Sequence, residues 1–555
     1  MKESITIYCK NTSSFIEVEA GASLLEIYEA VGSPLANRPL LGIVNNKGQS
    51  LTYRCYHPKD VEFVDYCATA GQRVYVRSLC HILSKAVHDV LPEAILYIEH
   101  PISKGYYCVI SGNDGVDKTA IERIRTRMRE IVAADMPFVL HTVRTEEAVS
   151  RFRSRGMFDK VRLAETAGRI YTSYYELDDY INFFYGCLTP STGYITTFDL
   201  IPYFDGLLLR VPRRDCPSEL EPVVRQDKMY EIYKESLLLL RALGLENTGD
   251  LNKAISEGRS REMILVAEAM QEKQIARIAD EIARRYSDGL RIVLISGPSS
   301  SGKTTFAQRL GIQLMTNFYQ PFAISLDDYF VERKDTPRDE SGDYDYESLY
   351  ALDLDYFNSD LNKLLAGEEI SLPSYDFTTG LRVYKNRKLC LTEGSLLIIE
   401  GIHALNPELT SHIADRHKFR VYVSALTSIS LDNHNWIPTS DNRLLRRIVR
   451  DYHCRNYSPV QTIARWPSVR KGEDKWIYPY QETADAMFNS AMLYELAALR
   501  RYADPILAEV REDEKENVEA RRLIRFLRYF NHISDFELPG TSLLREFLGG
   551  GSFTH

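Results

Sequence analysis

The chain has 555 residues, of which 44% are hydrophobic and 26% charged, and its formal net charge is −9 at pH 7. A chain of this length exceeds what one hydrophobic core can hold, so we expect about two to four domains. This negative net charge argues against a protein that binds duplex DNA through an extensive basic surface. No apolar run approaches the length needed to span a bilayer, so we expect no membrane partner.

The N-terminal stretch MKESITIYCKNTSSF has neither the apolar core of a signal peptide nor the arginine-rich pattern of a transit peptide. The nine cysteines are scattered along the chain, and none forms a CxxC pair. This usage favours reduced thiols over a disulfide framework or a structural zinc site. We therefore expect a cytoplasmic protein.

Residues 3–64 read as a small β-rich module. SITIYC, SFIEVEA, LLGIVNN, LTYRCY and DVEFVDY are short strand-like runs, and SLLEIYEAV has helical periodicity. Helices and strands then mix as far as residue 212, with a helix at SLCHILSKAVHDVL, paired strands at AILYIEH and YYCVISG, and a helix beginning after Asp117 as N-cap. Three prolines make residues 210–222 a linker, and residues 224–288 look helical throughout.

The pattern changes after Gly289. RIVLISG, PFAISLDD, SLLIIEG and KFRVYVSA are short apolar runs that end in polar or glycine residues and are separated by helical stretches. Buried parallel strands of an α/β domain have this pattern. The tail from Arg511 starts as a charged helix and ends in FNHISDFELPGTSLLREFLGGGSF.

Residues 297–304, GPSSSGKT, match the phosphate-binding pattern GxxxxGK[ST] between a predicted strand and a predicted helix. Glycines let backbone N–H groups curl around a phosphate, Lys303 neutralises phosphate oxygens, and the Thr304 hydroxyl can bind Mg²⁺. A plain glycine-rich turn does not require this strand and helix context. We predict nucleotide binding by Gly297, Ser299, Ser300, Ser301, Gly302, Lys303, Thr304 and Thr305.

Two acids end predicted strands: Asp327 ends AISLDD and Glu400 ends SLLIIEG. Carboxyl ends of parallel strands meet at one edge of a sheet, so both acids should converge on the phosphate loop. One carboxylate can then accept the proton of an incoming hydroxyl while the other helps to hold Mg²⁺. Alone, an Asp or Glu that leaves a strand is usually a solvated turn residue or a helix N-cap.

The segment NRLLRRIVRDYHCR places Arg443, Arg446 or Arg447, and Arg450 on one helix face, and Arg455 follows just beyond. Alone, a cationic helix face is usually a solvated surface. Beside a phosphate loop it is a candidate lid, whose guanidinium groups neutralise charge on a transferring phosphoryl group.

Residues 290–508 resemble the uridine kinase branch of the uridine kinase and phosphoribulokinase family of P-loop kinases. The motifs that carry the resemblance are, in order, GPSSSGKTT, SLDDYF, PSYDFTTGLR, IIEGIHALNP and RLLRRIVRD. The resemblance implies ATP and Mg²⁺ as cofactors, catalysis by Asp327 as general base together with Lys303, and metal binding by Thr304 and Glu400. Asp345 resembles the aspartate that holds the ribose hydroxyls in this family. The other substrate-pocket and lid positions correspond to Tyr375, Phe377, Arg382, Arg447, Arg450 and Arg455.

The sequence departs from this family at three places. Uridine kinases typically have PxYDFxxHSR, whose histidine reads the pyrimidine edge, and Gly380 stands there in this chain. The usual RGR of the lid is Arg455-Asn456-Tyr457, and a longer connection at residues 426–441 precedes the lid helix. Because the histidine that reads the base is replaced by Gly380, the sequence does not determine which acceptor the pocket binds.

Residues 3–65 resemble the TGS domain found in threonyl-tRNA synthetases and stringent-response proteins, through SFIEVEAGASLLEIYEAV and LGIVNNKGQSLTYRCYHPKDVEFV. Residues 70–212 resemble the second additional domain of threonyl-tRNA synthetase, through VRSLCHILSKAVHDVLP and YYELDDYINFFYGCLTPSTG. The anticodon-binding and aminoacylation parts have no counterpart in this chain.

That second domain edits mischarged tRNA with an HxxxH and a CxxxH pair. Here the pairs read Arg77-x-x-x-His81 and Phe184-x-x-x-Leu188, so three of the four residues are replaced. We therefore expect neither editing hydrolysis nor a metal there. His81 is expected to be a core histidine with satisfied hydrogen bonds or a binding-site remnant, and Cys187 a small buried thiol.

We thus expect a multidomain α/β chain. Its parts are a TGS-like domain at 1–66, a synthetase-like α+β domain at 67–222 with a degenerate editing site, a helical connector at 223–288, a P-loop kinase domain with a parallel sheet at 289–510 and a helical tail at 511–555. The front half is either a scaffold for dimerisation or stability, or a sensor for RNA or a small ligand.

The predicted function is ATP-dependent phosphorylation of the 5′-hydroxyl of a nucleoside, with uridine and cytidine as the first candidates. Gly380 keeps open a kinase acting on another small-molecule alcohol. The TGS-like module keeps open an RNA-associated regulator that senses nucleotide, and a homo-oligomer is compatible with either.

Overall fold

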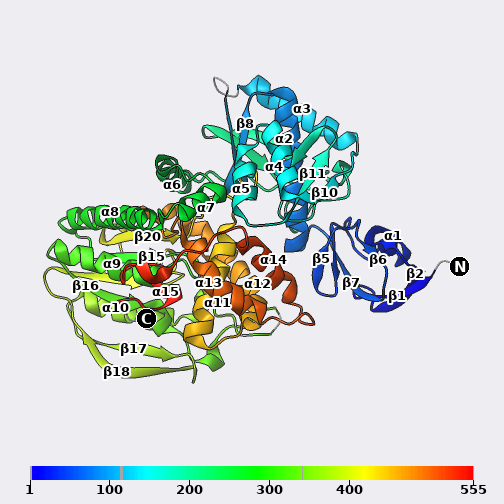
Figure 1. The fold of residues 1–555 in the computed structure, drawn as a ribbon. Helices are drawn as coiled ribbons and strands as arrows, with labels where there is room; N and C mark the ends of the chain where they lie inside the picture. The colour runs from blue at the N-terminus through cyan, green and yellow to red at the C-terminus, as the bar shows by residue number, and fades with distance from the viewer. Residues whose placement is uncertain (1–2, 113–116, 341, 554–555) are drawn as a thin grey trace.

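The computed structural model describes residues 3–112, 117–340 and 342–553, so residues 1–2 and 554–555 of the predicted first and last domains lie outside the described part (Figure 1). Six β-sheets form within these ranges. No helix in the described part of the chain is long and apolar enough to cross a membrane.

The N-terminal sheet has the strand order β2-β1-β7-β4-β5. Alternation in SITIYC buries Ile5, Ile7 and Cys9 on one face, as a half-buried strand requires. Ser23 begins the first helix with a capping box to Glu26. The elements are β1 (Ser4–Cys9), β2 (Ser14–Glu19), β3 (Ala22–Ser23), α1 (Leu24–Ala30), β4 (Leu41–Val44), β5 (Lys47–Gln49), β6 (Arg54–Cys55) and β7 (Lys59–Val64).

The next region combines two sheets, β13-β14-β9-β8 and β10-β11-β12, with four helices. Asp117 caps its helix as predicted, accepting the N–H of Ala120. The helix predicted at residues 78–91 begins earlier, at Thr69. Its residues from Val74 to Val87 are all buried. The elements are α2 (Thr69–Val90), β8 (Ile95–Ile102), β9 (Gly105–Ser111), α3 (Lys118–Ala133), β10 (Val139–Arg144), α4 (Thr145–Ser154), α5 (Phe158–Thr166), β11 (Tyr171–Leu177), β12 (Tyr180–Asn182), η1 (Thr192–Tyr194), β13 (Asp199–Tyr203) and β14 (Gly206–Arg210).

The segment predicted to be helical throughout forms three helices separated by short turns. Gly244 ends the first in a left-handed conformation, and Asn247 starts the second with a capping box. The helices are α6 (Asp227–Leu243), α7 (Thr248–Ser256) and α8 (Ser260–Tyr286).

The predicted parallel α/β sheet is confirmed, with strand order β16-β19-β15-β20-β21 and every pairing parallel. Every residue of the central strand β15 is buried, so protein covers both faces of the sheet there. The elements are β15 (Ile292–Ser296), α9 (Lys303–Thr316), β16 (Gln320–Ser325), α10 (Leu354–Leu365), β19 (Ser395–Glu400), β20 (Lys418–Ser424), α11 (Thr439–Arg455), α12 (Pro459–Trp476), β21 (Ala486–Asn489) and α13 (Glu495–Ala508).

An antiparallel hairpin, β17 (Ile370–Asp376) and β18 (Leu381–Leu389), extends beyond the parallel sheet and carries PSYDFTTGLR (Figure 1). Short 3₁₀ turns join the larger elements of this half. They are η2 (Leu326–Tyr329), η3 (Arg333–Asp335), η4 (Leu349–Ala351), η5 (Asp415–His417) and η6 (Tyr478–Thr483).

The connection at residues 426–441 ties the half that contains the parallel sheet to the front half. Lys160 of α5 is fully buried, and its Nζ donates to Asp159 Oδ2 at 3.1 Å and to Asp432 Oδ1 at 3.2 Å. Burial opposes the charge of Lys160, but the two carboxylates outweigh it and raise its pKa. The N–H of Ile98 also donates to the carbonyl of Asn433. The longer connection is therefore an interdomain anchor.

The C-terminal tail packs into the core around the parallel sheet. Its charged helix starts at Asn517 and not at the predicted Arg511, because residues 511–516 form turns. Leu543, Leu544 and Phe547 are fully buried. The elements are α14 (Asn517–Leu527), η7 (Asp535–Glu537) and α15 (Arg545–Leu548).

Candidate active site

The phosphate loop joins the central strand β15 to helix α9. A Cβ on Gly297 would lie 2.1 Å from the carbonyl oxygen of Val423, so only glycine fits at this position. Ser300 and Gly302 have positive φ angles of 58° and 82°. Left-handed residues of this kind curl the backbone into a concave nest that binds anions. The loop therefore has the backbone form that phosphate binding needs.

The first residues of α9 meet the end of β19. Thr304 Oγ1 donates to Glu400 Oε1 at 3.4 Å, and Ser325 Oγ donates to the same oxygen at 3.1 Å. Lys303 Nζ donates to the carbonyl of Pro298 at 3.3 Å. Mg²⁺ prefers oxygen ligands and usually combines one or two carboxylates with phosphates and water. The Thr304 hydroxyl and the Glu400 carboxylate fit such an ion.

The ionisable groups of this edge perturb one another. Burial raises the pKa of Glu400 to about 7, with Lys303 opposing the shift and Asp327 adding to it. The surrounding protein atoms also raise the pKa of Asp327, although Asp327 is exposed to solvent. Burial lowers the pKa of Lys303. Perturbed groups clustered in a cleft are typical of catalytic sites.

Helix α11 brings the predicted lid arginines onto the phosphate loop. Arg447 Nη1 donates to Ser299 Oγ at 2.9 Å, and Arg450 Nη2 donates to Ser300 Oγ at 3.3 Å. Arg443 Nη1 donates to the carbonyl of Ser299 at 3.0 Å. Arg443 is fully buried against Glu473, whereas the Arg447 and Arg450 guanidinium groups lie where they could contact a bound phosphate.

Arg455 extends from the last turn of α11. Its Nη1 donates to Asp451 Oδ1 at 3.3 Å, and its side chain is about half exposed. Its positive charge lowers the pKa of Asp327, though less than burial raises it. Arg455 thus acts electrostatically on the predicted base.

Three acids of the site were not identified from the sequence. Glu473 of α12 is fully buried, accepts the Ser299 N–H at 3.2 Å and pairs with Arg443 Nη2 at 2.7 Å. Burial raises the pKa of Glu347 to about 7. Glu546 of α15 contacts the start of α9. Glu473 and Glu546 come from segments outside the recognised motifs, so no local pattern marked them, whereas Glu347 lies two residues after the predicted Asp345.

The hairpin formed by β17 and β18 presents aromatic rings. The Tyr375 ring lies 4.9 Å from Phe377 and 5.5 Å from Phe330, both measured between centroids. The Tyr375 hydroxyl is buried and has no hydrogen-bond partner among the described residues. Phe377 is 50% exposed, so one face of the cluster is open to a ligand. Rings with an unpaired hydroxyl suit a flat acceptor with a polar edge.

Two other predicted substrate residues are engaged by protein groups. Arg382 Nη2 donates to Asp353 Oδ2 at 2.9 Å and to the carbonyl of Phe330 at 3.2 Å. Asp345 Oδ1 accepts the N–H of Glu347 at 3.1 Å. Their contacts with substrate stay predictions.

The four positions of the editing pattern also come together in the second region. Arg77 Nη1 donates to the carbonyl of Cys187 at 3.3 Å, and Phe184 and Leu188 are buried. His81 is fully buried, 5.5 Å from the Phe184 ring, and neither of its ring nitrogens has a hydrogen-bond partner within the described ranges. The expectation of a satisfied core histidine is therefore wrong, because aromatic rings fill its surroundings. Cys187 is half-buried and not the buried thiol expected.

Residues 292–496 match the family model described as "Phosphoribulokinase / Uridine kinase family". A uridine kinase of Ureaplasma urealyticum serovar 10 is 27% identical over 195 residues, which are 35% of this chain and 85% of that protein. A solved structure described as a possible uridine kinase from Bacillus stearothermophilus is 20% identical and covers 38% of this chain and 97% of its own, with a TM-score of 0.26.

The front half matches a different group of proteins. A threonine–tRNA ligase of Desulforamulus reducens is 28% identical over 186 residues, which are 33% of this chain. The chain spans only 29% of the length of that ligase. The chain therefore joins a region similar to the N-terminal part of threonine–tRNA ligases to residues 292–496, which match the phosphoribulokinase and uridine kinase family model.

Proposed function

We propose that the protein transfers the γ-phosphoryl group of ATP to the 5′-hydroxyl of a nucleoside, with uridine and cytidine as the first candidates. The observation that carries the proposal is the convergence of Lys303, Thr304, Asp327 and Glu400 at one edge of the parallel sheet. Family membership of residues 292–496 supports a P-loop kinase, and the aromatic hairpin supports a flat acceptor. The free cysteines and the use of ATP suit a cytoplasmic enzyme.

The residues of the phosphate loop, the sheet edge and α11 have different roles in the proposed reaction. Backbone N–H groups of the phosphate loop and Lys303 hold the phosphate oxygens. Asp327 accepts the proton of the acceptor hydroxyl as its oxygen attacks the γ-phosphorus and the bond to the ADP oxygen breaks. Arg447 and Arg450 neutralise charge on the transferring group. Thr304 and Glu400 would hold Mg²⁺, which would supply positive charge to neutralise the phosphate oxygens.

A second candidate acceptor is another small alcohol, and the surroundings of Gly380 favour it. Gly380 has a φ of +74°, and a Cβ there would lie 2.7 Å from the Cβ of Arg333. The Arg333 N–H donates to the Gly380 carbonyl at 3.0 Å. A histidine cannot replace Gly380 in this arrangement, so a base edge must be read by other groups or not at all.

An RNA-associated regulator is less well supported. On α3, Arg125 pairs with Glu122 and Asp199, and Arg127 pairs with Asp89. Arginines already neutralised by carboxylates have little left to offer RNA phosphates. We therefore retain the two kinase proposals.

The test is an acceptor panel. Purified protein is incubated with ATP, Mg²⁺ and each of a set of nucleosides, sugars and sugar phosphates, and ADP release and the phosphorylated product are measured. The first proposal predicts uridine or cytidine as the best acceptor. A product from another alcohol, with every nucleoside inert, would replace it with the second proposal.

A further inference from the structure

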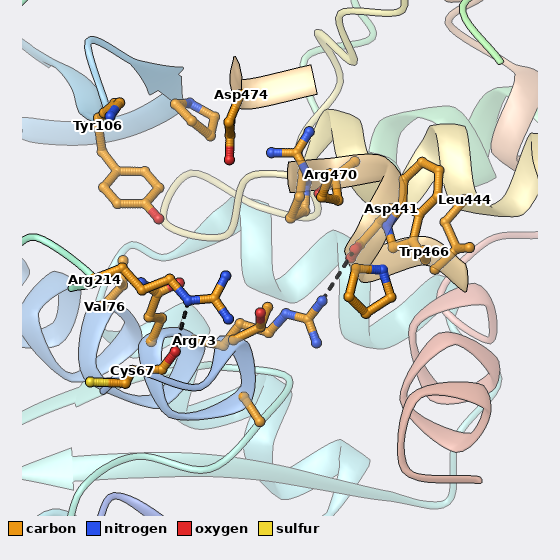
Figure 2. A pocket seen from close by; sticks show the side chains of 18 of the residues that line it. Cys67, Arg73, Val76, Tyr106, Arg214, Asp441, Leu444, Trp466, Arg470 and Asp474 are labelled. Atoms are coloured by element: carbon orange, nitrogen blue, oxygen red, sulfur yellow. Dashed lines mark hydrogen bonds and ion pairs between the residues drawn. The ribbon is translucent and has the colours of Figure 1, made fainter. Parts of the chain in front are cut away.

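A cavity of about 1410 Å³ lies between the front half and helices α11 and α12 (Figure 2). One wall comes from α2, β9 and residues 213–222, and the other from Trp436, the start of α11 and the face of α12. Segments far apart in the chain therefore build one binding-sized space.

Seven cationic side chains and five carboxylates line this cavity. Most of the cations have acidic partners, as Arg73 has in Glu519. Two do not: Arg77 Nη1 donates to the carbonyl of Cys187 at 3.3 Å, and Arg214 Nε donates to the carbonyl of Cys67 at 2.7 Å. Within the described ranges, neither guanidinium has a carboxylate within 4.0 Å. Arg77 is 8% exposed, so its charge is nearly buried without a counter-ion.

Aromatic rings stand beside these charges. The Tyr185 ring lies 5.1 Å from the Arg77 guanidinium carbon, and Trp436 packs against Tyr106 with centroids 4.4 Å apart. Uncompensated guanidinium groups bind phosphate, and aromatic rings stack on bases. We propose that this cavity binds a free nucleotide as an effector, at a site distinct from the phosphate loop.

The cavity is coupled to the phosphate loop through two helices. Asp441 and Leu444 line it from α11, the helix that places Arg447 on Ser299. Asp474 lines it from α12, next to Glu473, which accepts the Ser299 N–H. A ligand that shifts either helix therefore shifts loop contacts. The effect of the bound nucleotide on kinase activity rests on the proposed function. Binding of the nucleotide in the cavity does not, because it requires no catalysis.

The test is equilibrium binding of UMP and AMP to the full chain, measured by calorimetry and tryptophan fluorescence. Two of the three tryptophans, Trp436 and Trp466, line the cavity. We expect Arg77→Gln and Arg214→Gln each to weaken binding about tenfold, and Trp436→Phe to remove most of the fluorescence change. Arg225→Gln removes an exposed cation outside the cavity and should bind as the unmodified protein does.

Arg214 is exposed, so its substitution should not affect folding. Unchanged UMP and AMP affinity in Arg214→Gln and Arg77→Gln would overturn the proposal. A short RNA oligonucleotide forms the second arm. If it binds more tightly than either mononucleotide and loses binding in the same variants, the free nucleotide is overturned as the ligand.

A second, independent observation concerns the tail. The Thr305 N–H and Oγ1 donate to Glu546 Oε2 at 3.3 and 2.8 Å, and Arg450 Nη1 lies 3.5 Å from the other carboxylate oxygen. A Cβ on Gly302 would lie 2.4 Å from Leu543 Cδ2. In Figure 1, α15 lies beside the start of α9. An acidic group therefore occupies a donor in the first turn of α9, where the P-loop offers N–H groups to phosphate.

We infer that Glu546 competes with nucleotide phosphate for the start of α9, so that the tail restrains nucleotide binding. This inference rests on the proposed function only in that the loop binds nucleotide. The probe is fluorescent N-methylanthraniloyl-ATP. Glu546→Gln keeps the shape of the side chain and removes its charge, and we expect about tenfold tighter binding.

Glu537→Gln, an exposed acid of the same tail, is the control and should bind as the unmodified protein does. Equal or weaker binding by Glu546→Gln would overturn the restraint. No binding by any of the three proteins would instead contradict the nucleotide-binding function.

Discussion

The edge of the parallel sheet and the surroundings of His81 both resemble places where known families use polar side chains, and the two differ in how densely protein atoms fill them. At the sheet edge, Thr304 and Ser325 converge on Glu400, and solvent still reaches Asp327. Around His81, aromatic rings fill the space and leave both ring nitrogens without hydrogen bonds within the described ranges.

The difference shows in the charges that each place can sustain. At the sheet edge, burial raises the pKa of Glu400 to about 7, so that group can gain or lose charge near neutral pH. Burial lowers the pKa of His81 to about 3, which keeps the imidazole neutral. The sheet edge can therefore hold a group that titrates near neutral pH, whereas the filled surroundings keep His81 as a neutral side chain of the packed core.

The largest effect is expected from Lys303→Met. Removing the cation of the phosphate loop should lower kcat/KM for the best acceptor about a thousandfold, because the charge of the transferring group loses its stabilisation. Steady-state kinetics measures it, with the exposed Lys334→Met as control. Activity within about twofold of the unmodified protein would place the chemistry elsewhere.

Lys160→Met tests the anchor between the halves. It leaves Asp159 and Asp432 buried without their cation, which should cost about 3–5 kcal/mol of unfolding free energy. Denaturant unfolding measures the loss. Lys253→Met removes an exposed lysine and should change stability by about 0.5 kcal/mol at most. Equal stability of the two variants would show that the ion cluster is not structural.

Arg447→Ala tests the lid. The loss of its contact with Ser299 should reduce kcat about a hundredfold while the protein stays folded, because the guanidinium acts on the transferring group. Single-turnover kinetics separates this step from product release. Arg465→Ala, an exposed cation of α12, is the matched control. A rise in KM alone would make Arg447 a ground-state binding residue.

His81→Phe has the smallest expected effect and depends on pH. The pKa of about 3 in the folded protein lies below the ordinary value of 6.5, so the unfolded chain binds more protons as pH falls below 6.5. His81 therefore costs about 2 kcal/mol of stability at pH 5. The variant should lose that acid sensitivity, while exposed His57→Phe should not. Identical pH profiles for both variants would contradict the filled-site description.

The sequence was informative where function depends on neighbours in the chain. The phosphate loop, Asp327 and Glu400 each follow a strand, and parallel strands bring their carboxyl ends to one edge. Glu473 and Glu546 reach the same loop from α12 and α15, and only tertiary packing brings them there. A buried carboxylate on a distant helix leaves no local pattern.

The role of the connection at 426–441 was also hidden in the sequence. Its Asp432 looks like a solvated loop acid, but it is fully buried against Lys160. This ion pair depends on how the two halves of the chain dock. The local sequence around either residue carries no information about its partner in the other half. The unsatisfied His81 was missed for the same reason, since its neighbours come from several elements.

The most direct test of the central claim is the turnover number of Asp327→Asn with the best acceptor, measured beside the exposed Asp335→Asn. If Asp327 takes the acceptor proton, kcat should fall about a thousandfold while ATP affinity is retained and Asp335→Asn stays active. An Asp327→Asn variant that turns over within about twofold of the unmodified protein would contradict the claim that this edge of the sheet is the catalytic centre.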